Sequence, residues 1–195
     1  MAINSIANLT DSTVAGSNTQ IQYNNSGVFG ASSNLTFDGS TLAVTGALTV
    51  SGDITSSTAP AFMAYNDTTR SNVTGDGTVY TLPYNNETFD RGSDYNNSTY
   101  TFTAPVAGAY QFHMQVYITG NNGTIMEARI TTSNEDAYYE HHTVSHDAIQ
   151  MSSIFYMDAA DTCVFKVKVG GGTKVSDVYG ASAVYVTMAS GALIS

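Results

Sequence analysis

One stretch of alternating polarity, residues 110–118, limits this chain most strongly to a β-sheet fold. Its apolar and aromatic side chains recur at every second position and are Tyr110, Phe112, Met114, Val116 and Ile118. Successive side chains of a strand point to opposite faces, so this period of two predicts a long strand that buries one face. A proline and a glycine in residues 104–108 predict a turn that leads into it from a short strand at residues 100–102.

The segment around this strand resembles the globular heads of the complement C1q family. The most specific part is Phe-Thr-Ala-Pro-x-x-Gly-x-Tyr-x-Phe at residues 102–112. The first strand of that family is similar to residues 60–65, and its closing motifs are similar to residues 160–164 and 179–188, with Ala160 in place of a glycine. The resemblance covers residues 59–189. It implies a jelly roll related to tumour necrosis factor, trimeric about a threefold axis, and a binding function without catalysis.

The charge balance and the hydrophobic pattern limit the partners and location of the protein. The chain has 195 residues, with 16 acidic and 6 basic side chains and a formal net charge of −10. Affinity for phosphate backbones and anionic lipids depends on Lys and Arg, so neither nucleic acid nor membrane is expected as a partner. No run approaches the about 20 apolar residues of a membrane span. Residues 1–5 lack the features of a secretory signal, and we therefore expect assembly in a host cytoplasm.

Short units punctuated by glycine fill the region before the head. Residues 19–29 combine an alternating strand with an Asn-Asn-Ser-Gly turn, which predicts a hairpin. In the units that follow, two apolar residues flank a small one, and we interpret each unit as a minimal strand. The apolar residues of this repeat are Leu35, Phe37, Leu42, Val44, Leu48, Val50 and Ile54. Residues 1–16 are compatible with a short helix or an irregular arm.

A repeat this short cannot enclose a core within one chain. Three copies wound about one axis would bury these side chains, with the head as the nucleus of assembly. Residues 16–54 also resemble the stalk repeats of tailed-phage fibres. The sequence therefore predicts an all-β homotrimer, with an N-terminal arm and intertwined stalk at residues 1–58 and a C1q-like jelly-roll head at residues 59–195.

Metal and catalytic sites are not expected, although residues 135–147 are rich in histidine and carboxylates. If this segment is one strand, His142 and His146 share a face but stand about 13 Å apart, too far to hold one ion within a chain. A metal shared by histidines of three copies, or calcium held by loop Asp and Asn side chains, remains an alternative. The pair Asp90 and Asp94 lies in a loop without an apolar run to raise a pKa, which disfavours a glycosidase. We expect no enzyme activity and no cofactor.

Two further motifs have structural interpretations. Gly170–Gly172 lacks the Lys-Ser/Thr of a phosphate loop and lies between two apolar runs, so we interpret it as a hairpin tip. The single cysteine, Cys163, lies in an apolar strand pattern, which predicts a buried, unreactive thiol.

The function that these features favour is a non-enzymatic virion protein of a tailed phage. The trimeric fibre would dock to other virion proteins through its N-terminal arm and adhere with its knob to a glycan or protein of the host surface. We expect exposed loops at residues 121–123, 134–142 and 170–174, with a ligand-binding set made up of Asn121, Asn122, Asp136, Tyr138, Tyr139, His141 and Lys174. One alternative is a trimeric capsid decoration or head fibre that stabilises the shell. Another is a soluble C1q-like recognition protein of a cellular organism.

Overall fold

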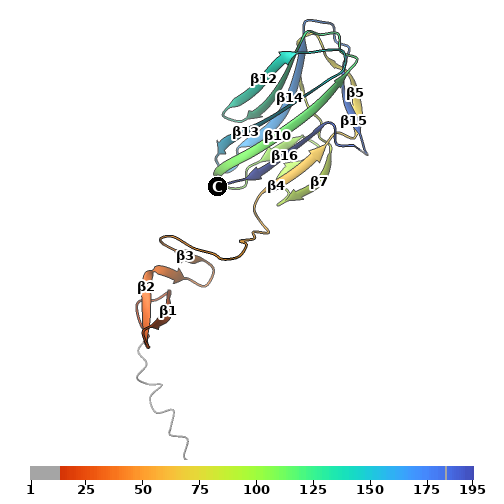
Figure 1. The fold of residues 1–195 in the computed structure, drawn as a ribbon. Helices are drawn as coiled ribbons and strands as arrows, with labels where there is room; N and C mark the ends of the chain where they lie inside the picture. The colour runs from red at the N-terminus through yellow and green to blue at the C-terminus, as the bar shows by residue number, and fades with distance from the viewer. Residues whose placement is uncertain (1–13, 183) are drawn as a thin grey trace, which may run out of the picture. The chain divides into compact units, whose positions relative to one another are not determined.

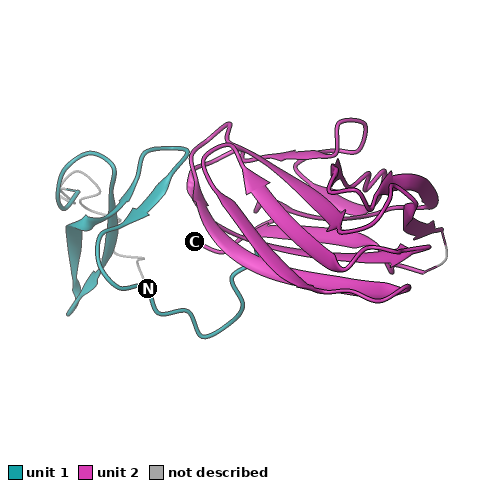
Figure 2. Cartoon of the chain, turned by 90° about the horizontal axis from the view of Figure 1, so that it is seen from above, with its two compact units in different colours: residues 1–55 teal, residues 56–195 magenta. Residues whose placement is uncertain are grey.

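The computed structural model describes residues 14–182 and 184–195. In these residues it contains sixteen β-strands and no helix, which confirms the predicted all-β class. The chain divides into two units, Met1–Thr55 and Ser56–Ser195, shown in Figures 1 and 2 and called here the front unit and the head. The arm or short helix predicted for residues 1–16 lies mostly outside the described residues.

The front unit is a three-stranded antiparallel sheet in the order β1 (Gln20–Asn25), β2 (Val28–Phe37) and β3 (Leu42–Val44). Ser26 and Gly27 form the turn between β1 and β2, with φ angles of 55° and 93°. Two successive positive φ values are typical of the tight hairpin turn whose twist matches antiparallel strands, so the predicted hairpin is confirmed. The strand predicted around Leu48 and Val50 is wrong, because no residue between 45 and 60 lies in a strand.

The head contains two sheets that face each other. The seven-stranded sheet has the order β5-β15-β10-β16-β4-β7, and β13 also pairs with β10. Its strands are β4 (Ala61–Tyr65), β5 (Thr68–Thr74), β7 (Asn86–Arg91), β10 (Gly108–Thr119), β13 (Asp147–Met157), β15 (Ser176–Ala181) and β16 (Met188–Leu193). The long alternating stretch forms β10, which pairs with β13 over eleven consecutive positions from Gly108↔Met157 to Ile118↔Asp147.

The six-stranded sheet has the order β12-β11-β14-β9-β8, and β6 also pairs with β14. Its strands are β6 (Val79–Thr81), β8 (Tyr95–Asn96), β9 (Thr101–Thr103), β11 (Ile125–Thr132), β12 (Asp136–His142) and β14 (Thr162–Gly170). In β14 every second residue is buried, as the alternating sequence requires. Because β9 and β10 belong to different sheets, residues 104–107 carry the chain from one layer to the other (Figure 1).

An aromatic cluster fills the space between the two sheets. Phe62 of β4 stacks on Tyr95 and Phe102, with ring centroids 4.6 and 5.3 Å apart, and Phe102 packs edge-on against Phe112. The alternating residues of β10 are fully buried, which confirms the face predicted for that strand. Offset and edge-to-face ring contacts stabilise a core beyond simple burial. Cys163 is also fully buried, as predicted.

Three local predictions in the head are wrong, one about which strands pair and two about where a strand begins or ends. Gly170–Gly172 is not a hairpin tip, since β14 and β15 lie in different sheets. Residues 135–147 are not one strand, because β12 ends at His142 and β13 begins at Asp147. The last strand, β16, begins at Met188, whereas the family pattern placed it at residues 184–188.

Candidate functional site

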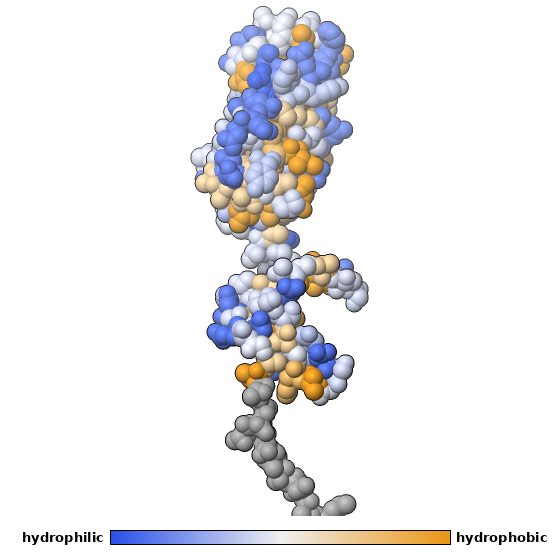
Figure 3. Space-filling view, turned by 90° about the vertical axis from the view of Figure 1, so that its left-hand side faces the viewer, coloured by the Kyte–Doolittle hydropathy of each residue, from blue (hydrophilic) through white to orange (hydrophobic). Residues whose placement is uncertain are grey.

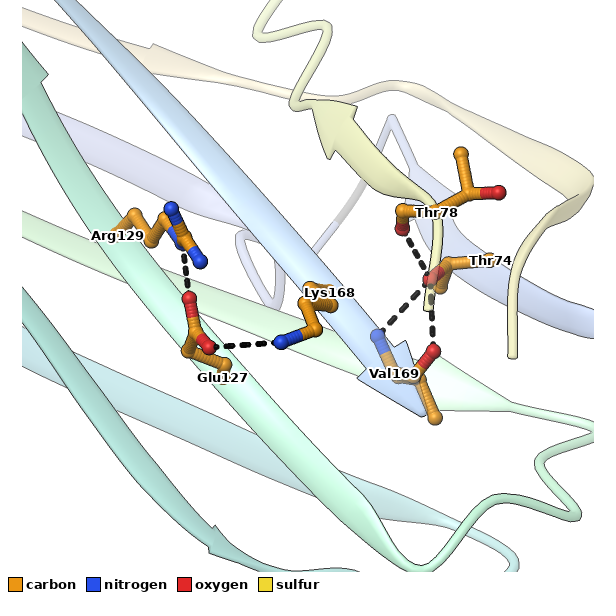
Figure 4. A network of polar contacts seen from close by, with 6 residues as sticks. All are labelled: Thr74, Thr78, Glu127, Arg129, Lys168 and Val169. Atoms are coloured by element: carbon orange, nitrogen blue, oxygen red, sulfur yellow. Dashed lines mark hydrogen bonds and ion pairs between the residues drawn. The ribbon is translucent and has the colours of Figure 1, made fainter. Parts of the chain in front are cut away.

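The outward face of the six-stranded sheet carries a network of charged side chains (Figure 4). Met126, Ala128 and Ile130 of β11 point into the core, so Glu127 and Arg129 between them point outward. Glu127 accepts from the Nε of Arg129 and, at 3.2 Å, from the Nζ of Lys168 on β14. The two cations cover Glu127 so well that it is only 3% exposed.

A second polar cluster lies where β5 passes the end of β14, also in Figure 4. The hydroxyl of Thr74 donates to the carbonyl oxygen of Thr78 at 2.6 Å and accepts from the backbone N–H of Val169 at 2.9 Å. Thr74 is fully buried. A buried hydroxyl with both of its roles satisfied contributes to holding these two segments together, which is a structural function.

The residues of the predicted ligand-binding set do not form one site. The prediction that Asn121 is exposed is wrong. It is 6% exposed and its amide is fully engaged within the head. Its Nδ2 donates to the Thr143 hydroxyl and the Val144 carbonyl oxygen, and its Oδ1 accepts from Gly123 N–H and the Ser176 hydroxyl. Asn121 therefore ties its own loop to residues 143–144 and to the start of β15 instead of offering donors to a ligand.

Asn122 and Lys174 lie at the same end of the head as Asn121. Asn122 is exposed, but its Oδ1 accepts from the N–H of Thr173 and its Nδ2 donates to the Thr173 hydroxyl. Lys174 is exposed in the connection between β14 and β15. The chain enters the head at the opposite end from these loops. At that entry point the N–H of Leu193, near the C-terminus, donates to the carbonyl oxygen of Pro60.

The other four predicted residues lie on β12, at one edge of the six-stranded sheet, and are divided between its two faces. Asp136 and Tyr138 point outward, where the guanidinium carbon of Arg129 lies 5.8 Å from the centre of the Tyr138 ring. Tyr139 and His141 point the other way, toward β13, with ring centres 6.2 Å apart. His141 Nε2 also lies 3.2 Å from Asp147 Oδ2. A single ligand of ordinary size cannot contact all four.

The prediction that Asp90 and Asp94 lie in a loop is wrong for Asp90, which belongs to β7, whereas Asp94 lies between β7 and β8. Both oxygens of Asp90 accept backbone N–H groups, from Asp94 and Tyr95. Burial, and then the charge of Asp90, raise the pKa of Asp94, so the prediction that nothing raises a pKa here is wrong. Burial and the same charge also raise the pKa of Glu87. Among the described residues, no group of three or more His, Cys, Asp or Glu side chains could hold a metal ion.

The outward face of the seven-stranded sheet is largely uncharged and is exposed in a single chain. A shallow hollow of about 360 Å³ lies over β4, β7, β10 and β16, lined by Ala61, Phe62, Phe89, Gln111, His113, Ser190, Gly191 and Ala192. Small residues account for its depth, since Gly191 and the alanines place little volume there. On β13, which pairs with β10 beside the hollow, Ile154 and Tyr156 protrude with more than half of their surface exposed.

The repeat of the front unit is also exposed. Leu35 and Phe37 lie in β2 opposite Val44 and Leu42 of β3. Leu42 is 59% exposed, Leu48 65% and Ile54 75%, and Phe37, Val44 and Val50 are exposed as well. Figure 3 shows hydrophobic side chains at the surface of this unit. Apolar residues in such numbers on a small sheet are typical of a surface that another chain covers.

Sequence reasoning missed Glu127, Arg129, Lys166 and Lys168. Their signal was present, because Met-Glu-Ala-Arg-Ile and Phe-Lys-Val-Lys-Val place charges at every second position of two strands. Each strand alone indicates only a solvated face. The register of β11 against β14 brings the four side chains together, and that register is a property of the folded sheet.

Two facing antiparallel sheets with this strand order define the head as a jelly roll of the C1q and tumour necrosis factor type. The globular domain of zebrafish complement 1qA matches with a TM-score of 0.50 and 15% identity, over 70% of this chain and 98% of that chain. Murine APRIL matches with a TM-score of 0.51 and 11% identity, over 69% of this chain and 98% of that chain. The fold implied by the sequence resemblance is therefore confirmed.

A third solved structure, the PRD1 vertex protein P5, matches with a TM-score of 0.47 and 14% identity, over 71% of this chain and 99% of that chain. Similarity at this level carries no inference about function. No profile of a known protein family matches the sequence, and neither does any curated protein. Within the described residues, no helix is both long and apolar enough to span a membrane.

Proposed function

We propose that this chain is a non-enzymatic structural protein of a tailed-phage virion. It forms a homotrimeric fibre whose N-terminal arm and intertwined stalk span residues 1–58 and whose jelly-roll knob, residues 59–195, adheres to the host surface. The first residues dock the fibre to other virion proteins.

One observation carries the proposal: most apolar side chains of the front-unit repeat are left exposed by the residues that the structure describes. Leu42, Leu48 and Ile54 each expose more than half of their surface. Fully burying such a side chain contributes about 1.5–3 kcal/mol, so three copies that bury the repeat together gain a large stabilisation. The sequence resemblance of residues 16–54 to phage stalk repeats supports the same arrangement.

The head supports self-association independently. The residues that line the hollow of the seven-stranded sheet include no Lys, Arg, Asp or Glu, and depletion of charge is typical of interface cores. The protruding side chains of β13 and the hollow occupy different parts of one sheet face. Contact between such different patches is heterologous and can close into a ring, as in a cyclic trimer.

Adhesion would then depend on avidity. Three equivalent knobs on one stalk convert weak contacts into strong attachment, provided that the receptor groups lie within reach of all three. The loops around Asn122 and Lys174 lie at the end of the head away from its entry point, which favours them as a contact surface.

A binding assay separates this function from the capsid-decoration alternative. The purified full-length chain is labelled and mixed with host cells and, separately, with capsids that lack fibres. Binding to cells without binding to capsids supports the adhesive fibre. Binding to capsids without binding to cells contradicts it and assigns the chain to the shell.

A further inference from the structure

The outward face of the six-stranded sheet gathers half of the cationic side chains of an acidic protein. Three of the six basic residues, Arg129, Lys166 and Lys168, lie on the adjacent strands β11 and β14. Lys166 is directly opposite Arg129 in the ladder, and like charges in that position destabilise a sheet. The chain has 16 acidic residues, yet none of them stands opposite Lys166 in this ladder.

Glu127 does not neutralise this cluster. Its two oxygens are committed to Arg129 and Lys168, so one negative charge is shared by two positive ones. The ammonium group of Lys166 makes no hydrogen bond or ion pair with any residue that the structure describes, and Lys166 is partly exposed. On β11 and β14 three positive charges face one negative charge, and the other two carboxylates of this face, Asp136 and Glu140, lie on β12, two strands away from Lys166. Arg129 is also held in place by its contact with the buried carboxylate.

An exposed aromatic ring lies next to the cluster on the neighbouring strand. Tyr138 pairs with Arg129 across β11 and β12, and the guanidinium carbon lies 5.8 Å from its ring centre. Tyr138 remains 66% exposed. Asp136 and Glu140 lie two residues on either side of Tyr138 and therefore on the same face, where their carboxylates can accept hydrogen bonds.

We infer that this face binds an acidic saccharide. The sugar carboxylate contacts Lys166 and Arg129, the sugar ring lies on Tyr138, and its hydroxyl groups donate to Asp136 and Glu140. An acidic peptide fits less well, because it supplies few hydroxyl donors for the two carboxylates that flank Tyr138. The inference rests on the proposed adhesive function and names the chemistry of its ligand. This face also stays free if copies associate through the seven-stranded sheet.

The test measures binding of the full-length chain to a tetramer of α-1,4-linked galacturonate and to maltotetraose, its uncharged counterpart. Calorimetry at low and moderate salt gives both affinities. We expect binding of the acidic tetramer only, weakened by salt. Lys166→Gln and Tyr138→Ala should each weaken it about tenfold or more, as for loss of one charge-assisted bond or one stacking contact. Arg91→Gln, which removes an exposed arginine from β7 in the other sheet, is the matched control and should leave the affinity unchanged.

Thermal unfolding of the same samples separates binding from folding. Lys166→Gln relieves a like-charge contact, so its midpoint should equal or exceed that of the parent chain while its affinity falls. Equal affinity for both tetramers, no binding of the acidic tetramer, or equal losses in Lys166→Gln and Arg91→Gln would each overturn the inference. Displacement of the tetramer by the same concentration of inorganic phosphate would assign the cluster to simple anions and overturn the saccharide. Cell binding by a chain that ignores the acidic tetramer refutes this inference alone and leaves the adhesive function standing.

Discussion

Glu127→Gln tests whether the charged network on the six-stranded sheet stabilises the head. The substitution keeps the shape of the side chain and removes its charge. It leaves Arg129 and Lys168, with side chains 28% and 32% exposed, without their shared partner. Loss of one partner from a fully buried pair costs about 3–5 kcal/mol, and the partial exposure of both cations reduces the expected cost to about 1–3 kcal/mol.

Glu140→Gln provides the matched control for this prediction. Glu140 lies directly opposite Glu127 on β12 but is exposed and has no ion pair among the described residues. Its substitution should change stability by less than about 0.5 kcal/mol. The assay is thermal or urea unfolding at one fixed chain concentration, because association makes stability concentration-dependent. A loss of about 2–4 °C in Tm per kcal/mol is expected for Glu127→Gln. Equal midpoints for the two variants would refute the reasoning.

Three further predictions concern single positions. Ala160 has a φ of 75°, a strained backbone conformation for alanine, so Ala160→Gly should stabilise the head by about 0.5–1 kcal/mol in urea unfolding. Ala159 has no positive φ, so Ala159→Gly should destabilise the head. The opposite order of the two variants would contradict strain at Ala160. Burial raises the pKa of the Cys163 thiol well above its ordinary value. A thiol reagent should therefore react with the native protein far more slowly than with the protein in denaturant. Equal reaction rates would show that Cys163 is not buried. Hydrogen bonds lower the pKa of Asp161, and the largest effect comes from the Ser133 side chain. The carboxylate therefore stabilises the fold above about pH 4, and this contribution is lost on further acidification. The deficit of Asp161→Asn seen at neutral pH should therefore shrink in acid, and a deficit independent of pH would argue against the charge.

The local sequence pattern was enough to predict features that depend on a single strand or turn. The alternation in β10 predicted a buried face because the period of two is itself the geometry of a strand. The hairpin at Ser26 and Gly27 was predictable because its turn chemistry is local. The buried Cys163 followed from the same alternation.

Prediction failed where the sheet assignment of a strand decides the outcome. The apolar runs on either side of Gly170–Gly172 suggested a hairpin, yet β14 and β15 belong to different sheets, which no local residue encodes. The segment around Asn121 has a composition typical of a surface loop. The burial of Asn121 depends on hydrogen bonds with Val144 and Ser176, which lie far along the chain. The cluster around Lys166 depends on strand register for the same reason.

The molar mass of the full-length chain in dilute buffer, measured by light scattering, tests the central claim most directly. Leu42, Leu48 and Ile54 of the front unit are largely exposed in the described part of one chain, and three copies are proposed to cover them. We expect a single species of three times the chain mass of 20.6 kDa. A species of 20.6 kDa in which residues 19–54 are protected from proteolysis would contradict the account.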